Sequence, residues 1–171
     1  VEDNPPDARL TQEHLSQAST GVQFDVTHTA TLKDARQKLA EGPYDVVLLD
    51  LGLPDAVGLE ALIQIDDLAT GMPIVVLSGL RDEMLAVQAV RRGAQDYLVK
   101  GFGESGYLSR SILFALERKR SERYLSHLAH YDGLTNIPNR RLLYDRLGVA
   151  IAHARRSREH VALMFLELDR F

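Results

Sequence analysis

Five polar residues follow short apolar runs of this sequence, and their types suit the chemistry of a phosphoryl group. They are Glu2, Asp3, Asp50, Ser78 and Lys100. Three carboxylates brought together require a cation, and Mg²⁺ prefers oxygen ligands while keeping water molecules that a phosphate can replace. A carboxylate beside Mg²⁺ and an ammonium group can attack phosphorus, and both cations stabilise the charge that develops. Ser78 would donate a hydrogen bond to an attached phosphoryl oxygen.

This chemistry requires elements that bring the five residues together. Near-continuous apolar runs predict buried strands at 44–50 and 73–79, and shorter runs predict strands at 96–99 and 24–27. Helical patterns lie between them, at 7–19, 31–40, 57–69 and 82–92. Such alternation predicts an α/β fold with a doubly wound parallel sheet. Since the carboxyl ends of parallel strands meet at one rim, Glu2 and Asp3 are expected to face Asp50, with Lys100 alongside.

The composition narrows the class of protein. The chain has 171 residues, 45% of them hydrophobic and 26% charged, which is typical of a globular protein. The net charge of −4 argues against a general nucleic-acid binder, and no apolar run is long enough for membrane insertion. The absence of cysteine excludes disulfides and thiolate metal sites. We therefore expect a cytoplasmic protein.

Four stretches together resemble the response-regulator receiver domain: VEDN, DLGLPDAVG, VVLSG and DYLVKG. They match it in order and in spacing, with 28 residues from Asp50 to Ser78 and 50 from Asp50 to Lys100. The resemblance implies a flavodoxin-like, five-stranded parallel sheet over residues 1–118. In that family the first strand precedes the acidic pair. Only Val1 stands there in this sequence, so we expect further residues before it.

The resemblance also implies a role for each residue of the acidic group. Asp50 would be the phosphoacceptor, receiving its phosphoryl group from a histidine kinase or a phosphotransfer protein. Mg²⁺ would be held by Asp3, Asp50 and the backbone carbonyl of Gly52, with Glu2 acting through water.

Two further residues would form the switch of the receiver. The Ser78 hydroxyl would move toward the phosphate, and the ring of Tyr97 would turn inward behind it. The family commonly has a proline after the lysine, where this sequence has Gly101.

A helix is expected to link the receiver to a second domain. It covers residues 105–130, with one face apolar in its first half and basic further on. The apolar part would pack on the receiver or on a second chain, and the charged part resembles an exposed connector or a short coiled coil. Together with a switch face at about 79–110, it would favour a homodimer.

Residues 131–171 resemble the start of the diguanylate cyclase (GGDEF) domain, an α+β domain. The opening motif consists of Asp132, Leu134, Thr135, Pro138, Asn139 and Arg140. A helix at 139–154 would follow, and HVALMFLELDRF is similar to the first strand of that domain with its loop. The resemblance implies GTP as the substrate and cyclic di-GMP as the product. The guanine-binding region and the GGDEF signature would lie beyond residue 171, so residues 131–171 alone are not expected to make cyclic di-GMP.

The metal and phosphate sites of this second domain map onto the last residues. Where the family has a metal-binding aspartate, this sequence has Glu167, and Leu168 would supply a backbone carbonyl. Arg170 and Phe171 would lie at the phosphate-binding loop. Glu167 carries one methylene more than aspartate, which displaces its carboxylate in a site that demands near-ideal octahedral geometry.

Three functions therefore stay open. The first is a two-component response regulator whose receiver controls a cyclic di-GMP output domain. The second joins the receiver to a catalytically degenerate GGDEF domain that acts as a nucleotide sensor or as a scaffold for a phosphodiesterase (EAL) domain. The third is a flavodoxin-like cofactor binder. Taken singly, the acidic residues also have ordinary structural readings, with Asp50 capping a turn, Glu2 and Asp3 capping a helix, and Glu167 ending a strand without a metal.

Overall fold

The chain forms two compact units, Val1–Glu122 and Arg123–Phe171. The structure is a computed structural model, and it describes residues 1–18, 21–69, 71–79, 82–101 and 106–167.

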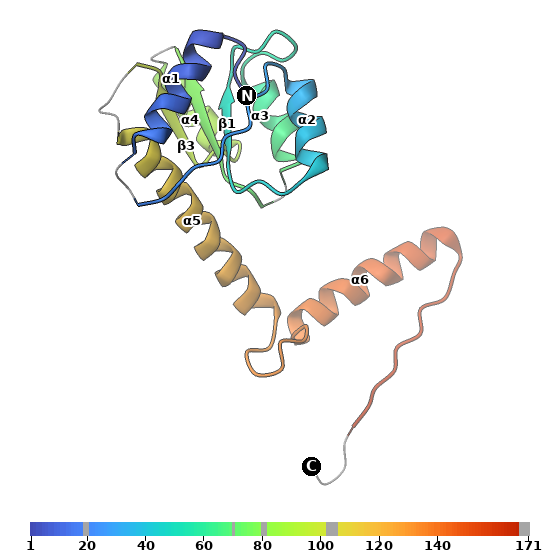
Figure 1. The fold of residues 1–171 in the computed structure, drawn as a ribbon. Coiled ribbons are helices and arrows are strands. Elements are labelled where there is room, and N and C mark those ends of the chain that lie inside the picture. Colours follow the sequence, from blue (N-terminus) through green and yellow to red (C-terminus); the bar gives the residue numbers. More distant parts are fainter. Residues whose placement is uncertain (19–20, 70, 80–81, 102–105, 168–171) are drawn as a thin grey trace. The chain divides into compact units, whose positions relative to one another are not determined.

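The first unit contains a parallel sheet of three strands (Figure 1). They are β1 (Val47–Asp50), β2 (Ile74–Ser78) and β3 (Asp96–Val99), in the order β1-β2-β3. The three apolar runs thus form strands as predicted, and the α/β fold with a parallel sheet is confirmed. The predicted count of five strands is not confirmed, because the described residues contain three.

Helices bury both faces of this sheet. Ile74 and Val76 of β2 lie in one core cluster, together with residues from three helices. Val75 and Leu77 lie on the opposite face of the sheet and pack with Ala115 of a fourth helix. Since side chains alternate along a strand, this division places helices on both faces, as a doubly wound sheet requires. The described residues of this unit contain the helices α1 (Pro5–Ser16), α2 (Leu32–Glu41), α3 (Leu59–Asp66) and α4 (Glu83–Arg91) and the part of α5 (Tyr107–His130) that ends at Glu122.

The strand predicted at 24–27 does not form. Val1 lies beside β1: its α-amino group donates to the carbonyl of Leu48 at 2.7 Å, and the N–H of Asp50 donates to the carbonyl of Val1 at 3.0 Å. Next to Val1, a cavity of about 140 Å³ is lined both by residues 24–29 and by residues 46–48. No described strand fills it, so the prediction was wrong because residues 24–27 have no neighbouring strand to pair with.

A tight turn opens the part of the chain that follows α5. One carboxylate oxygen of Asp132 accepts hydrogen bonds from the N–H of Leu134 and from both the N–H and the hydroxyl of Thr135. Asn139 then caps α6 (Arg140–Ser157) by accepting from the N–H of Leu142 at 3.1 Å. Four residues of the motif recognised in the sequence, Asp132, Leu134, Thr135 and Asn139, therefore build the turn and start the helix.

The strand expected after α6 is also absent from the described residues. Residues 159–167 have no regular structure, and Met164, Phe165 and Leu166 are each at least 80% exposed. The prediction was wrong because no described strand offers an edge to this segment, and an unpaired strand is not stable in water. Within the described ranges, no helix is long and apolar enough to cross a membrane.

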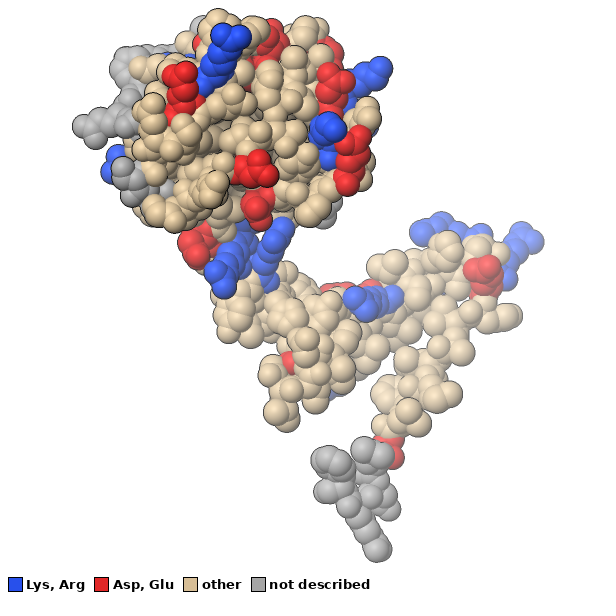
Figure 2. All heavy atoms as spheres, in the orientation of Figure 1, with Lys and Arg blue, Asp and Glu red and all other residues tan. Residues whose placement is uncertain are grey.

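Charged side chains of both signs mix on the surface of the first unit. On the face shown in Figure 2, acidic and basic residues are interspersed among other side chains, without a broad region of one sign.

Candidate functional site

Asp50 is the last residue of β1, and the fold encloses its side chain at the carboxyl edge of the sheet. The residue is 8% exposed. One carboxylate oxygen accepts from the N–H of Gly52 at 3.0 Å, and the other lies 2.7 Å from the ammonium nitrogen of Lys100. A carboxylate held in this way is oriented but still has lone pairs for a cation or for attack on phosphorus.

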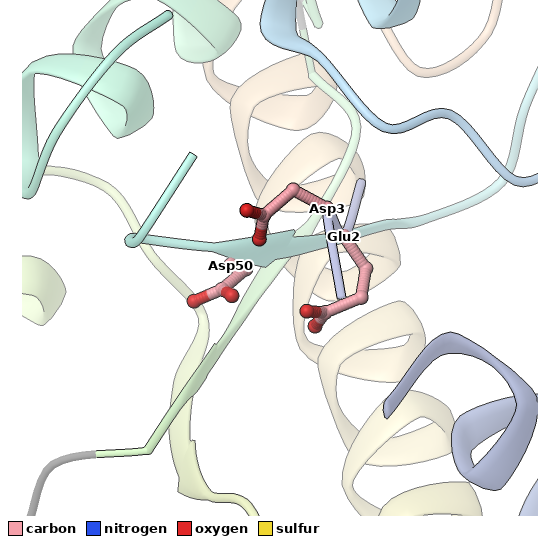
Figure 3. A group of neighbouring side chains, drawn as sticks. All are labelled: Glu2, Asp3 and Asp50. Carbon is pink, nitrogen blue, oxygen red and sulfur yellow. The ribbon is translucent and has the colours of Figure 1, made fainter. Parts of the chain in front are cut away.

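Glu2 and Asp3 lie beside Asp50, as Figure 3 shows. One carboxylate oxygen of each residue lies within 4.8 Å of the corresponding oxygens of the other two. The N-terminal segment is placed there by the pairing of Val1 with β1 and by the Glu2 N–H, which donates to the carbonyl of Thr29 at 2.9 Å. Glu2 is buried like Asp50, whereas Asp3 is exposed.

Lys100 follows β3 and is the cation of this group. Its ammonium nitrogen lies 2.6 Å from Glu2, 2.7 Å from Asp50 and 3.1 Å from Asp7. The contact with Glu2 is a close ion pair, but the Oε2 oxygen that makes it does not have the geometry of a hydrogen bond. The main chain of Lys100 is fixed because its N–H donates to the carbonyl of Ser78 at 2.8 Å. Burial lowers the pKa of Lys100, but its bonds to the three carboxylates outweigh burial, so the pKa is raised and the side chain is charged.

The donor set fits a divalent cation. Glu2, Asp3 and Asp50 bring three carboxylates together, and of these Lys100 contacts Glu2 and Asp50. Burial raises the pKa of Glu2, and the charge of Asp50 adds to this effect, although Lys100 opposes it. Uncompensated negative charge on oxygen ligands at an open edge is what Mg²⁺ would balance. Gly52 lies directly against Asp50, and the role of its carbonyl stays a prediction.

Ser78 and Tyr97 lie on adjacent strands. Ser78 ends β2 and is 5% exposed. Tyr97 of β3 pairs with Val76, which lies two residues before Ser78 on β2, and its side chain packs against the core cluster that contains Val76. Both residues therefore belong to the same side of the sheet, and Ser78 is one position beyond Leu77, the partner of Asp50. Their switching role stays a prediction.

Gly101 has a backbone angle φ of +73°. A proline at this position is held near −65° and cannot adopt that conformation. Proline at position 101 is therefore incompatible with the backbone conformation that Gly101 adopts.

The predicted site of the second domain is only partly described. Glu167 is exposed and belongs to no acidic cluster among residues that the structure describes. Leu168, Arg170 and Phe171 lie outside the described residues.

Asp7 was missed in the sequence. Its carboxylate approaches Lys100 from the first turn of α1. The signal was available: a helix that begins directly after the acidic pair must place its first turn at the same rim.

Comparison with known families agrees with this geometry. The family model of the response regulator receiver domain matches residues 1–110, and that of the diguanylate cyclase GGDEF domain matches residues 129–171. Since the first match covers more than half of the chain, the chain belongs to the response regulator receiver family. It is thus a two-component response regulator, and it also carries the start of a GGDEF domain.

Curated relatives resemble the receiver part. The chain is 41% identical over 87 residues to the transcriptional regulatory protein KdpE of Mycobacterium tuberculosis, a match that covers 51% of this chain and 38% of the relative. It is 32% identical over 123 residues to KdpE of Staphylococcus aureus, covering 72% and 52%. The chain therefore spans about half or less of the length of these relatives.

Solved structures show the same fold. A response regulator receiver domain from Clostridium thermocellum superposes with a TM-score of 0.60 at 24% identity, covering 71% of this chain and 94% of that one. The beryllofluoride-activated receiver domain dimer of NtrC4 superposes with a TM-score of 0.58 at 25% identity, covering 69% and 93%.

Proposed function

We propose that the chain receives a phosphoryl group on Asp50 and passes this signal to a cyclic di-GMP output domain. One observation carries the proposal. The buried carboxylate of Asp50 lies 2.7 Å from the ammonium of Lys100, beside two further carboxylates that suit Mg²⁺. A protein of this class acts in the cytoplasm.

In the transfer, a carboxylate oxygen of Asp50 forms a bond to phosphorus. The bond between phosphorus and the phosphohistidine nitrogen of a histidine kinase or phosphotransfer protein breaks, and that nitrogen keeps the electron pair. Lys100 and the hydroxyl of Ser78 would receive the phosphoryl oxygens. Asp3, Asp50 and the carbonyl of Gly52 would hold Mg²⁺, with Glu2 acting through water, and the metal would supply further neutralisation of the phosphoryl charge when bound.

The phosphorylated receiver would form a homodimer through its switch face. The exposed side of α4 supports this proposal, because Met84, Val87 and Val90 are 69%, 50% and 49% exposed and lie at helical spacing. The relative NtrC4 is described as an activated receiver domain dimer. Two GTP-loaded cyclase halves must meet to make cyclic di-GMP, so dimerisation is a suitable switch.

Phosphate incorporation tests the receiver part. With acetyl phosphate and Mg²⁺, the wild-type chain is expected to gain one phosphoryl group by intact mass, and Asp50→Asn is expected to gain none. Asp45→Asn is the matched control, because Asp45 lies exposed shortly before β1 in the same segment. Equal incorporation by Asp50→Asn would refute the proposal.

Glu167 supports a second candidate for the output. Its exposed position where the family has a metal-binding aspartate favours a degenerate GGDEF domain that serves as a nucleotide sensor or as a scaffold for an EAL domain. The full-length protein with GTP and Mg²⁺ distinguishes the two. Cyclic di-GMP that rises with acetyl phosphate supports the cyclase, and its absence while Asp50 is still phosphorylated supports the sensor or scaffold.

A further inference from the structure

Lys100 contacts three carboxylates that come from three separate segments. Glu2 lies on the N-terminal segment, Asp50 at the end of β1 and Asp7 in the first turn of α1. Glu2 and Asp50 belong to the acidic group that suits a divalent cation, whereas Asp7 does not. The third partner of the ammonium thus lies outside the group that would hold the metal.

This difference matters because the chemistry proposed above engages the other two partners. A cation that Asp50 binds directly and Glu2 binds through water competes with Lys100 for the oxygens of both carboxylates. A phosphoryl group on Asp50 converts its carboxylate into an uncharged anhydride carbonyl, which is a weaker acceptor. Of the three carboxylates, Asp7 alone is then engaged by neither the cation nor the phosphoryl group, so it stays available to the ammonium beside the phosphoryl oxygens.

The backbone holds Asp7 and Lys100 in fixed places. Pro5 and Pro6 restrict the first turn of α1, and the N–H of the buried Ala8 donates to the carbonyl of Asn4 at 3.0 Å. The main chain of Lys100 is bonded to the end of β2. Both main chains are therefore anchored, so only side-chain torsions have to be ordered to bring Asp7 to 3.1 Å from the ammonium.

We propose that Asp7 is a positioning residue for Lys100. It holds the ammonium at the rim when Glu2 and Asp50 interact with Mg²⁺ instead, and it thereby favours Mg²⁺ binding. The inference rests on the proposed function, since it assumes that this rim binds Mg²⁺. The simpler role of Asp7, favourable charge at a helix N-terminus, predicts only a change in stability.

Magnesium affinity, measured by calorimetry on the 171-residue chain, separates these roles. Asp7→Asn is expected to weaken Mg²⁺ binding about fivefold, the size of a partly exposed ion pair. Asp7→Glu is expected to restore affinity, because it returns the carboxylate. Glu13→Gln is the matched control, removing a carboxylate from the exposed side of the same helix, and is expected to change nothing.

A double-mutant cycle then shows whether Asp7 acts through Lys100. In the background of Lys100→Met, Asp7→Asn is expected to have no further effect on Mg²⁺ affinity. An effect of the same size there would overturn the inference, since Asp7 would then act only through its charge. Should Lys100→Met fail to fold, the ¹⁵N NMR signal of the Lys100 ammonium in the Mg²⁺-saturated chain replaces the cycle. Slow hydrogen exchange of this ammonium that is lost in Asp7→Asn supports the inference. A signal that Asp7→Asn leaves unchanged overturns it.

The outcomes distinguish the inference from the proposed function. A wild-type chain that does not bind Mg²⁺ overturns both. Wild-type binding that Asp7→Asn leaves unchanged overturns the role of Asp7 alone, and the proposed phosphorylation of Asp50 stands.

Discussion

Replacing Lys100 with methionine is expected to destabilise the first unit strongly. Methionine keeps much of the apolar stem but removes the ammonium that lies 2.6 Å from Glu2 and 2.7 Å from Asp50. Both carboxylates are buried, at 5% and 8% exposure, so they would be left close together without a cation.

The size of the loss follows from this burial. Removing one partner of a buried ion pair costs about 3–5 kcal/mol, because the remaining charge stays desolvated. The Lys100 side chain is 19% exposed and that of Asp7 is 36% exposed, so water reaches one side of the group. We therefore expect the lower limit, about 3 kcal/mol at pH 7.

The loss is expected to depend on pH and on Mg²⁺. Burial already holds the pKa of Glu2 above its ordinary value of 4.5, and removing Lys100 raises it further. A carboxylate whose pKa is higher in the folded state binds more protons there, so stability falls as pH rises above 4.5. The variant should approach wild type near pH 4.5, and at pH 7 added Mg²⁺ should recover part of the loss.

Urea unfolding, followed by circular dichroism between pH 4.5 and 8, measures this prediction. Lys38→Met is the matched control: Lys38 pairs with Glu41 at 2.7 Å, but both side chains are nearly half exposed, so little change is expected. If Lys100→Met were as stable as Lys38→Met at pH 7, burial of the Glu2 and Asp50 carboxylates would not require the ammonium of Lys100. That result would refute our electrostatic account of the rim.

A further prediction concerns the switch face. Val87→Glu, on the exposed side of α4, should keep the phosphorylated chain monomeric in sedimentation velocity without reducing phosphate incorporation, and a dimer as stable as wild type would place the interface elsewhere.

The sequence predicted the rim because strand ends in a parallel sheet have a fixed relation to each other. Asp50 ends one predicted strand and Lys100 follows another, and the two residues meet as that topology requires. The helix after the acidic pair already indicated that Asp7 lies near the rim, but its contact with Lys100 was missed because it also depends on how α1 is rotated there.

The two incorrect strands share one physical cause. Residues 24–27 and 161–167 have β-like sequences, but a strand exists only when a neighbour completes its hydrogen bonds. Beside 24–27 the structure has a cavity, and beside 161–167 no described strand lies. The local sequence indicates whether a segment tends to form a β-strand, but the strand forms only where a neighbouring strand pairs with it.

Chemical trapping of the phosphorylated residue tests the central claim most directly. Borohydride reduces an aspartyl phosphate to homoserine, so the chain treated with acetyl phosphate and Mg²⁺, then reduced and digested, reports the acceptor by peptide mass. We predict homoserine at position 50, and none when the phosphodonor is left out. Homoserine at another aspartate, or at no position in a folded chain that binds Mg²⁺, would contradict the assignment of Asp50 as the phosphoacceptor.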